Sequence, residues 1–153
     1  MTHFILDVDG VLTTGQYLYS SGGKQYKVFG AHDHDGLKLL PDFLTIEFVS
    51  ADARGFEISK RRIVEDMGFP LTLVKEHERL SYLNTNYGLK NVIYMGDGYY
   101  DAEILSNVGL GIAPNNARIE AIRAADYVTP SASGQGAVLD ACLHIIEYLK
   151  AHD

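Results

Sequence analysis

Two aspartates, Asp7 and Asp9, stand one residue apart at the end of an apolar run and are followed at once by Gly10. Side chains two residues apart in a strand point to the same face, so both carboxylates are expected together at the carboxyl end of that strand. Open α/β sheets bind their ligands there. Adjacent carboxylates repel each other unless they share a proton or a cation neutralises them. The pattern therefore favours a site for a hard divalent cation, with Mg²⁺ preferred when a phosphate is also present.

Later strand-like runs are also followed by residues that could do chemistry. Asp97 lies in a Gly-Asp-x-x-x-Asp pattern that ends at Asp101, and Ser50 ends another run. A basic residue, Arg79 or alternatively Lys75, comes just past a third run, at the start of a predicted helix. Acidic, hydroxyl and basic groups are thus all predicted at the carboxyl ends of strands, where a doubly wound sheet would gather them.

Strand-like and helix-like stretches alternate along the chain, as is typical of parallel β-α units. The expected strands are residues 4–8, 44–49, 71–74, 92–95, 110–113 and 127–129. One helix is expected to stop at Gly68, and a closing helix carries an apolar stripe from Val138 to Leu149 that includes Cys142 as a core residue. These elements predict a doubly wound, Rossmann-like three-layer α/β/α sandwich with a mainly parallel sheet, covering residues 1–153 as one domain.

One segment, at about residues 14–30, interrupts the alternation. It is rich in Tyr, Val, Gly and Ser, with Ser21-Gly22-Gly23 in its middle, which predicts a β-hairpin inserted after the first strand. An isolated two-stranded hairpin is only marginally stable in water. Its aromatic residues are therefore expected to pack on something else, such as another subunit.

Composition narrows the classes of partner. The chain has 153 residues, 46% of them hydrophobic, which suits an ordinary globular protein with a real core. A formal charge of -7 disfavours nucleic acid and anionic membranes as partners. The lone cysteine, the lack of a long apolar stretch and the absence of a leader-like start favour a cytoplasmic protein.

The motifs, taken in order, resemble those of the haloacid dehalogenase superfamily of phosphotransferases. Asp7-Val8-Asp9-Gly10-Val11 is similar to the first motif and Ser50 to the second. Arg79 or Lys75 is similar to the third, and Asp97 with Asp101 to the fourth. The resemblance covers almost the whole chain and implies a phosphomonoester hydrolase.

The resemblance also implies a role for each residue. Asp7 would be the nucleophile that forms an aspartyl-phosphate, and Asp9 the general acid and then the general base. Mg²⁺ would be held by Asp7, Asp97 and the backbone carbonyl of Asp9, with Asp101 supporting these ligands from behind. The phosphoryl group and substrate would be bound by Gly10, Ser50, Ala51 and the basic residue, Arg79 or Lys75.

A closer resemblance is to one capless branch, typified by 3-deoxy-D-manno-octulosonate 8-phosphate phosphatase and including phosphatase domains of sialic-acid-type pathways. The lack of a cap-sized insertion, the hairpin and the runs 125–129 and 134–138 carry this resemblance. It implies a sugar-phosphate or sugar-acid-phosphate substrate (3-deoxy-octulosonate 8-phosphate-like or nonulosonate 9-phosphate-like). It also implies a homotetramer in which a neighbouring subunit covers each active site.

The chain departs from the branch at several positions. In its substrate loop, Asp33 and Gly36 fit the pattern, but His32 stands where arginine is expected. Leu139 replaces a second arginine, and Asp52 follows Ser50-Ala51 where Thr-Gly-Arg is frequent. Neither His nor Leu can grip a carboxylate as arginine does, so the substrate could be a different phosphorylated sugar.

Two alternatives stay open at this point. Residues 32–35 carry alternating His and Asp, which could hold a second metal, although a polar loop near the site is the favoured interpretation. The departures also keep open a non-catalytic or regulatory oligomerisation module that retains the fold. Such a module would be expected to have lost Asp7, Asp9 or Asp97, and all three are present.

Overall fold

The computed structural model describes residues 1–152, and its centre is a six-stranded parallel sheet with the order β5-β4-β1-β6-β7-β8. The strands are β1 (His3–Asp7), β4 (Thr45–Ser50), β5 (Leu71–Leu73), β6 (Val92–Met95), β7 (Leu110–Ala113) and β8 (Tyr127–Val128). All six predicted strands are confirmed, with ends that differ by no more than one residue. The chain builds outward from β1 on one side and then crosses to β6 on the other. This reversal opens a crevice at the carboxyl ends of β1 and β6, where such sheets bind ligands.

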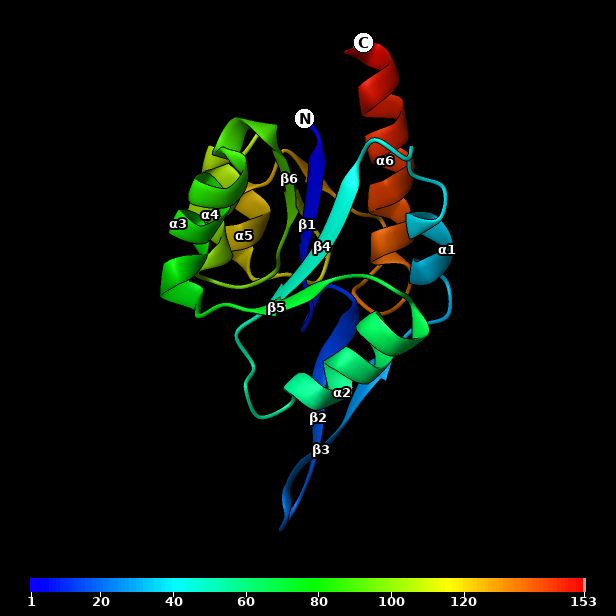
Figure 1. Cartoon of the computed structure of the whole chain (residues 1–153), viewed down its shortest axis with the longest axis vertical. Coiled ribbons are helices and arrows are strands. Elements are labelled where there is room, and N and C mark those ends of the chain that lie inside the picture. The colour runs from blue at the N-terminus through cyan, green and yellow to red at the C-terminus, as the bar shows by residue number, and fades with distance from the viewer. Residues whose placement is uncertain (153) are drawn as a thin grey trace.

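Helices cover both faces of the sheet, which confirms the predicted three-layer fold (Figure 1). One face carries α1 (Asp33–Leu37) and α6 (Ala137–Ala151), and the other carries α3 (Glu76–Tyr87), α4 (Asp101–Asn107) and α5 (Ile119–Ala124). Alternate residues of β1 point to opposite faces of the sheet. Phe4 and Leu6 pack in the core beneath α6, and Ile5 packs in the core beneath α3 and α4. The shorter elements are α2 (Phe56–Lys60), the π-helix η1 (Arg61–Asp66) and the 3₁₀ helix η2 (Leu89–Asn91).

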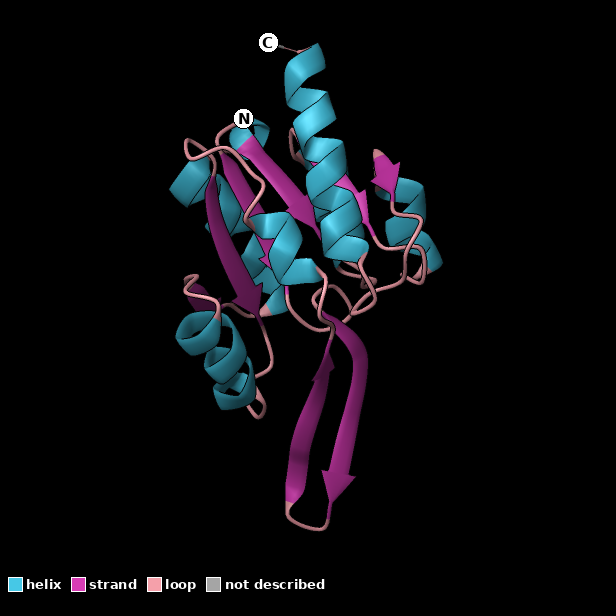
Figure 2. Cartoon of the chain, turned by 90° about the vertical axis from the view of Figure 1, so that its right-hand side faces the viewer, coloured by secondary structure: helices cyan, strands magenta, loops and turns pink. Residues whose placement is uncertain are grey.

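The predicted hairpin is present as β2 (Thr13–Ser20) and β3 (Gly23–Phe29), paired antiparallel. It projects well beyond the layered body and is not covered at its tip (Figure 2). Leu18, Tyr19 and Tyr26 are 54%, 61% and 65% exposed. Exposing large apolar side chains to water is unfavourable. A group of them on a projecting hairpin is therefore typical of an interaction surface.

Asp33 occupies a structural position that its sequence context did not suggest. The residue is buried, and its Oδ1 atom accepts hydrogen bonds from the backbone N–H groups of Val138 (3.0 Å) and Leu139 (3.3 Å). These N–H groups belong to the first turn of α6, whose positive end a carboxylate stabilises. Gly36 lies against the same turn, because a Cβ there would come within 2.7 Å of the Cα of Leu139. Both residues thus join α1 to α6.

We expect Asp33→Ala to lower the free energy of unfolding by about 1–3 kcal/mol, because it leaves the buried N–H of Val138 and the partly buried N–H of Leu139 without this acceptor. Asp33→Asn should cost less, since an amide oxygen can replace Oδ1. Urea denaturation measures both changes. Asp35→Ala is the matched control, because the Asp35 side chain is 68% exposed on the same helix. Equal effects at the two positions would show that Asp33 does not hold α6.

Candidate active site

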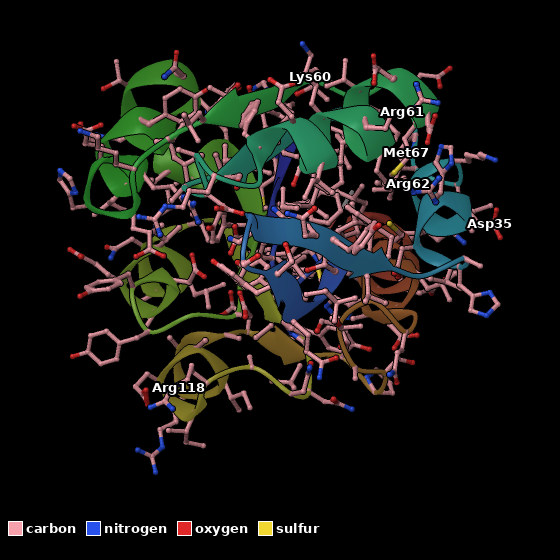
Figure 3. The ribbon with its side chains drawn as sticks, turned by 90° about the horizontal axis from the view of Figure 1, so that it is seen from below. Asp35, Lys60, Arg61, Arg62, Met67 and Arg118 are labelled. Atoms are coloured by element: carbon pink, nitrogen blue, oxygen red, sulfur yellow. The ribbon has the colours of Figure 1, made fainter. Side chains whose placement is uncertain are left out.

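A pocket of about 600 Å³ lies in the crevice at the carboxyl ends of β1, β4 and β6. It is lined by Asp7, Asp9, Gly15, Tyr17, Ser50, Ala51, Asp52, Lys75, Glu76, His77, Arg79, Asp97, Gly98 and Asp101. Figure 3 looks onto this end of the molecule, with Arg61 and Arg118 at its periphery. Both arginines pair with acidic residues of their own segments, Arg61 with Glu65 and Arg118 with Glu120. Neither of these two arginines is therefore the cation beside the pocket floor, which is Arg79.

Three carboxylates from two strand ends converge on the floor of the pocket. Asp7, Asp97 and Asp101 each offer an oxygen, and these atoms lie within 4.8 Å of one another. Burial raises the pKa of Asp97 to about 7, and the charge of Asp101 adds to the effect. Burial also raises the pKa of Asp7, more strongly than the nearby Arg79 guanidinium lowers it. A cluster of this kind becomes fully charged at neutral pH only with a cation beside it, so it fits a divalent ion with oxygen ligands.

Asp101 braces the loop that presents Asp97. Its Oδ2 atom accepts hydrogen bonds from the N–H groups of Asp97 (3.0 Å) and Gly98 (2.8 Å). Its Oδ1 atom accepts one from the hydroxyl of Tyr94 at 2.6 Å. Because both oxygens of Asp101 already accept hydrogen bonds, the geometry suits the supporting role that the family resemblance implies. Tyr94 was not foreseen, although a hydroxyl in an otherwise apolar strand was the available signal.

Gly10 lets the end of β1 approach this loop. Its φ angle is +80°, and a Cβ at this position would overlap the carboxylate of Asp97. Gly10 is thus adjacent to the carboxylate cluster, while Gly15 and Tyr17 of the hairpin base form the nearer pocket wall. A direct contact of Gly10 with substrate stays a prediction.

The structure separates the two candidate basic residues. Arg79 is only 3% exposed, and its Nη1 atom lies 3.4 Å from an oxygen of Asp7 and 3.4 Å from Asp101. The same atom donates a hydrogen bond to the hydroxyl of Tyr94 at 3.0 Å. Among residues 1–152, its buried Nε atom has no hydrogen-bond partner. Lys75 is exposed at the start of α3 and contributes to the outer wall.

We therefore expect Arg79→Met to lower kcat/KM for p-nitrophenyl phosphate by on the order of 10²–10³-fold, since it removes the buried cation beside Asp7. Lys75→Met is the matched control and should change it by a few-fold at most. Arg79→Lys, which keeps the charge, should recover part of the loss. Thermal melting establishes that each variant is folded. The reverse ranking, with Lys75→Met the more damaging change, would make Lys75 the phosphate-binding base.

Ser50 is buried at the end of β4 and is one of the residues that line the pocket. Its Oγ atom accepts a hydrogen bond from the N–H of Asp52 at 3.1 Å. That bond orients the side chain and leaves the hydroxyl proton for an anionic ligand. Ala51 continues the same wall.

Asp9 lies on the hairpin side of the pocket and has a cationic partner that the sequence analysis missed. The Nζ atom of Lys27, in β3, is 3.0 Å from each carboxylate oxygen of Asp9. The hydroxyl of Thr13 also points to Asp9, at 3.5 Å. Strand alternation was the available signal, because it puts Lys27 and Phe29 on one face of the hairpin and Tyr26 and Val28 on the other.

The contact of the substrate loop with substrate stays a prediction, because the loop lies away from the pocket formed by a single chain. His32, Asp33 and Gly36 are not among the residues that line the pocket of their own chain. Asp33 and Gly36 are instead used to pack α1 on α6, and His32 is exposed just before α1. Within residues 1–152, the group able to share a metal ion is Asp7, Asp97 and Asp101, so the residues at 32–35 gain no support as a second metal site.

No helix formed by residues 1–152 combines the length and apolar character that crossing a membrane requires.

Comparisons with known proteins agree with this geometry. Residues 75–141 match the family model of haloacid dehalogenase-like hydrolases. The 3-deoxy-D-manno-octulosonate 8-phosphate phosphatase of Salmonella typhi is 33% identical over 147 residues, which span 90% of this chain and 75% of the relative. The cobalt-bound structure of the corresponding Haemophilus influenzae phosphatase superimposes with a TM-score of 0.81 at 29% identity, covering 96% of this chain and 88% of that one.

A phosphatase structure from Moraxella catarrhalis supports the fold alone. It was solved with magnesium, phosphate and the sugar acid bound, and it has a TM-score of 0.83 at 24% identity, covering 100% of this chain and 94% of that one. The relatives and the family model together assign the branch that was expected from the motifs. This chain therefore belongs to the haloacid dehalogenase-like hydrolases, among the phosphatases related to 3-deoxy-D-manno-octulosonate 8-phosphate phosphatase.

Proposed function

We propose that the chain is a Mg²⁺-dependent phosphomonoester hydrolase that releases phosphate from a phosphorylated sugar or sugar acid through an aspartyl-phosphate on Asp7. In this proposal residues 1–153 act as one phosphatase domain, with the hairpin as its insertion. The observation that carries it is the placement of the Asp7 carboxylate at the pocket floor, 3.4 Å from the Arg79 guanidinium and within the Asp97–Asp101 cluster. A nucleophilic carboxylate and an anionic phosphate repel each other, so this chemistry needs the cations that such an arrangement gathers.

The reaction has two displacements at phosphorus. An oxygen of Asp7 forms a bond to phosphorus while the bond to the sugar oxygen breaks, and Asp9 gives its proton to that leaving oxygen. A water molecule then attacks the same phosphorus and passes a proton to Asp9, and the bond to Asp7 breaks. Inorganic phosphate leaves, and both carboxyl groups return to their starting states.

The other polar groups of the pocket would bind the phosphoryl group or the metal ion, as their positions suggest. The Arg79 guanidinium and the Ser50 hydroxyl would hold phosphoryl oxygens and orient the phosphorus toward Asp7. Asp7, Asp97 and the backbone carbonyl of Asp9 would hold Mg²⁺, which supplies positive charge to offset the repulsion between carboxylate and phosphate. The cobalt bound in the Haemophilus influenzae relative supports a divalent cation here.

The substrate class follows from the relatives, whose names specify 3-deoxy-D-manno-octulosonate 8-phosphate. A 3-deoxy-octulosonate 8-phosphate-like or nonulosonate 9-phosphate-like compound is the first choice. The pocket wall carries Asp52, where the branch often has arginine. Asp52 cannot bind a substrate carboxylate as arginine does, so neutral sugar phosphates belong in the same test.

The test is a screen for phosphate release from sugar phosphates and sugar-acid phosphates, each with Mg²⁺ and with excess chelator. We expect at least one compound to be hydrolysed far faster than p-nitrophenyl phosphate, with the activity lost in chelator. Activity that is unchanged by chelation would contradict the metal-dependent mechanism. Uniformly slow hydrolysis of every sugar phosphate, with faster turnover of another phosphoester class, would contradict the substrate assignment.

We also propose that the chain forms a homotetramer in which a neighbouring subunit covers the pocket. The exposed Leu18, Tyr19 and Tyr26 on the projecting hairpin support this, because they offer an apolar surface that assembly would bury. Light scattering should give four times the chain mass, and Tyr19→Ser with Tyr26→Ser should reduce it. A monomer for the unchanged protein at micromolar concentration would contradict the proposal.

A further inference from the structure

Lys27 is the most completely buried cation of the hairpin, and it points back from β3 into the body of the protein. The exposed fraction of its side chain is 0%, although Leu18, Tyr19 and Tyr26 of the same hairpin are exposed. Burying an ammonium group costs several kcal/mol unless it is well paired. The contacts of the Lys27 ammonium group must therefore compensate for the cost of burying it.

Those contacts reach three separate segments. The Nζ atom of Lys27 lies 3.0 Å from both oxygens of Asp9, after β1, and 3.0 Å from Oδ2 of Asp52, after β4. It donates a further hydrogen bond to the Oγ atom of Ser59, in α2, at 2.8 Å. The packing around it is close, because a Cβ on Gly55 would come within 2.7 Å of the Lys27 Cε. The ammonium group is thus held in one place by four atoms.

Asp9 is the partner whose position matters for chemistry. Its carboxylate is drawn to the hairpin side of the pocket, while Asp7, Asp97 and Asp101 gather on the floor. A carboxylate that must exchange protons with the leaving oxygen has to stay clear of the metal ligands. Two equal 3.0 Å contacts to one ammonium group supply that restraint.

We propose that Lys27 is a positioning residue that fixes Asp9 for proton transfer. The inference rests on the proposed function, because it assumes that Asp9 is the general acid and base. Lys27 acts through Asp9 and does not touch the phosphoryl group.

Lys24 is a matched control on the same strand. Its Nζ atom also pairs with Oδ2 of Asp52, at 2.8 Å, and lies 3.5 Å from the centre of the Tyr17 ring. Its hydrogen bond and ion pair are with Asp52, and those of Lys27 include Asp9 as well. Lys24→Met and Lys27→Met therefore each remove one cation beside Asp52, and only the second frees Asp9.

The experiment measures kcat/KM for phenyl phosphate and p-nitrophenyl phosphate, in the presence of Mg²⁺. Phenol is the poorer leaving group and needs the proton from Asp9 more. We expect Lys27→Met to lower kcat/KM for phenyl phosphate by on the order of 10²-fold and for p-nitrophenyl phosphate by much less. Lys24→Met should leave both values, and their ratio, close to those of the unchanged protein. A parental ratio in folded Lys27→Met would overturn the inference.

A double-mutant cycle separates this inference from the proposed function. Lys27→Met introduced into Asp9→Asn should cause no further loss, because Lys27 acts through the carboxylate that is already gone. An undiminished further loss would show that Lys27 has a general structural role and would overturn the inference alone. Parental activity in Asp9→Asn by itself would instead overturn the proposed role of Asp9.

Circular dichroism checks folding, and Lys27→Arg serves if Lys27→Met does not fold. The planar guanidinium keeps the charge but changes the contact with Asp9, so the phenyl to p-nitrophenyl ratio should shift in the same direction by a smaller factor. An unshifted ratio in Lys27→Arg would count against the positioning role.

Discussion

Asp7→Asn is expected to lower kcat by on the order of 10⁴-fold or more, because an amide cannot form the covalent bond to phosphorus. The change nearly preserves shape, and the variant should fold and retain the hydrogen bond from the Val8 N–H to the side-chain oxygen, which is 2.9 Å long. It removes one charge from the crowded floor, so its thermal stability without metal should not fall. The measurement is phosphate release from the best sugar phosphate, with residual activity checked for traces of the parent enzyme.

The matched control for this change is Asp42→Asn, which makes the same substitution at an exposed position outside the pocket. Its kcat should equal that of the unchanged protein. Substantial turnover by the Asp7 variant would place the nucleophile elsewhere and exclude an aspartyl-phosphate at this residue.

Asp97→Asn is expected to abolish most of the response to Mg²⁺ and to lower kcat/KM by on the order of 10³-fold, since a metal ligand is lost. The same change should stabilise the metal-free protein at pH 8. The pKa of Asp97 is about 7 in the folded chain against an ordinary 3.8, so the folded state holds a proton that the unfolded state has lost between these values. Stability without metal therefore falls as pH rises across that window, and a neutral amide escapes the loss.

Thermal melting with and without Mg²⁺ tests this second prediction independently of activity. The unchanged protein should gain stability when Mg²⁺ is added at pH 8, and Asp97→Asn should gain little. Chelator should return the unchanged protein to its lower melting temperature. An equal gain from Mg²⁺ in both proteins would show that the ion binds without Asp97.

The strands and the acidic residues could be predicted because their signals are local. An apolar run that ends in Asp7-x-Asp9-Gly10 gives both the strand and the direction of its last side chains. The same holds for Asp97, whose loop to Asp101 is only a few residues long. The parallel order of the strands then brings these distant segments together, as the alternation of elements indicates.

The choice between Lys75 and Arg79 needed the structure, because the two residues are one helical turn apart and could share a face. Burial distinguishes the two residues and favours Arg79 as the phosphate-binding base: Arg79 lies against Asp7 and Tyr94, and Lys75 is exposed at the helix start. Asp33 does not line the pocket of its own chain, and its contact with substrate stays a prediction. Its partner is the first turn of α6, more than one hundred residues away, and no local pattern reveals such a contact.

Lys27 was missed for a related reason. A lysine in a strand of a projecting hairpin is by default a solvated residue. Its burial follows from the way the base of the hairpin folds back over Asp9 and Asp52, which is a property of the tertiary arrangement. Strand alternation predicts which face of the hairpin carries Lys27, but it does not predict that Asp9 and Asp52 are its partners.

The central claim is that Asp7 accepts the phosphoryl group beside a divalent cation. The most direct measurement is a crystal structure of the protein with Mg²⁺ and beryllium trifluoride, which mimics a phosphoryl group on a carboxylate. We expect beryllium to be bonded to a carboxylate oxygen of Asp7, with Mg²⁺ held between Asp7 and Asp97 and a fluorine facing Arg79. Beryllium trifluoride on any other residue, or Mg²⁺ bound away from Asp7 and Asp97, would contradict the mechanism.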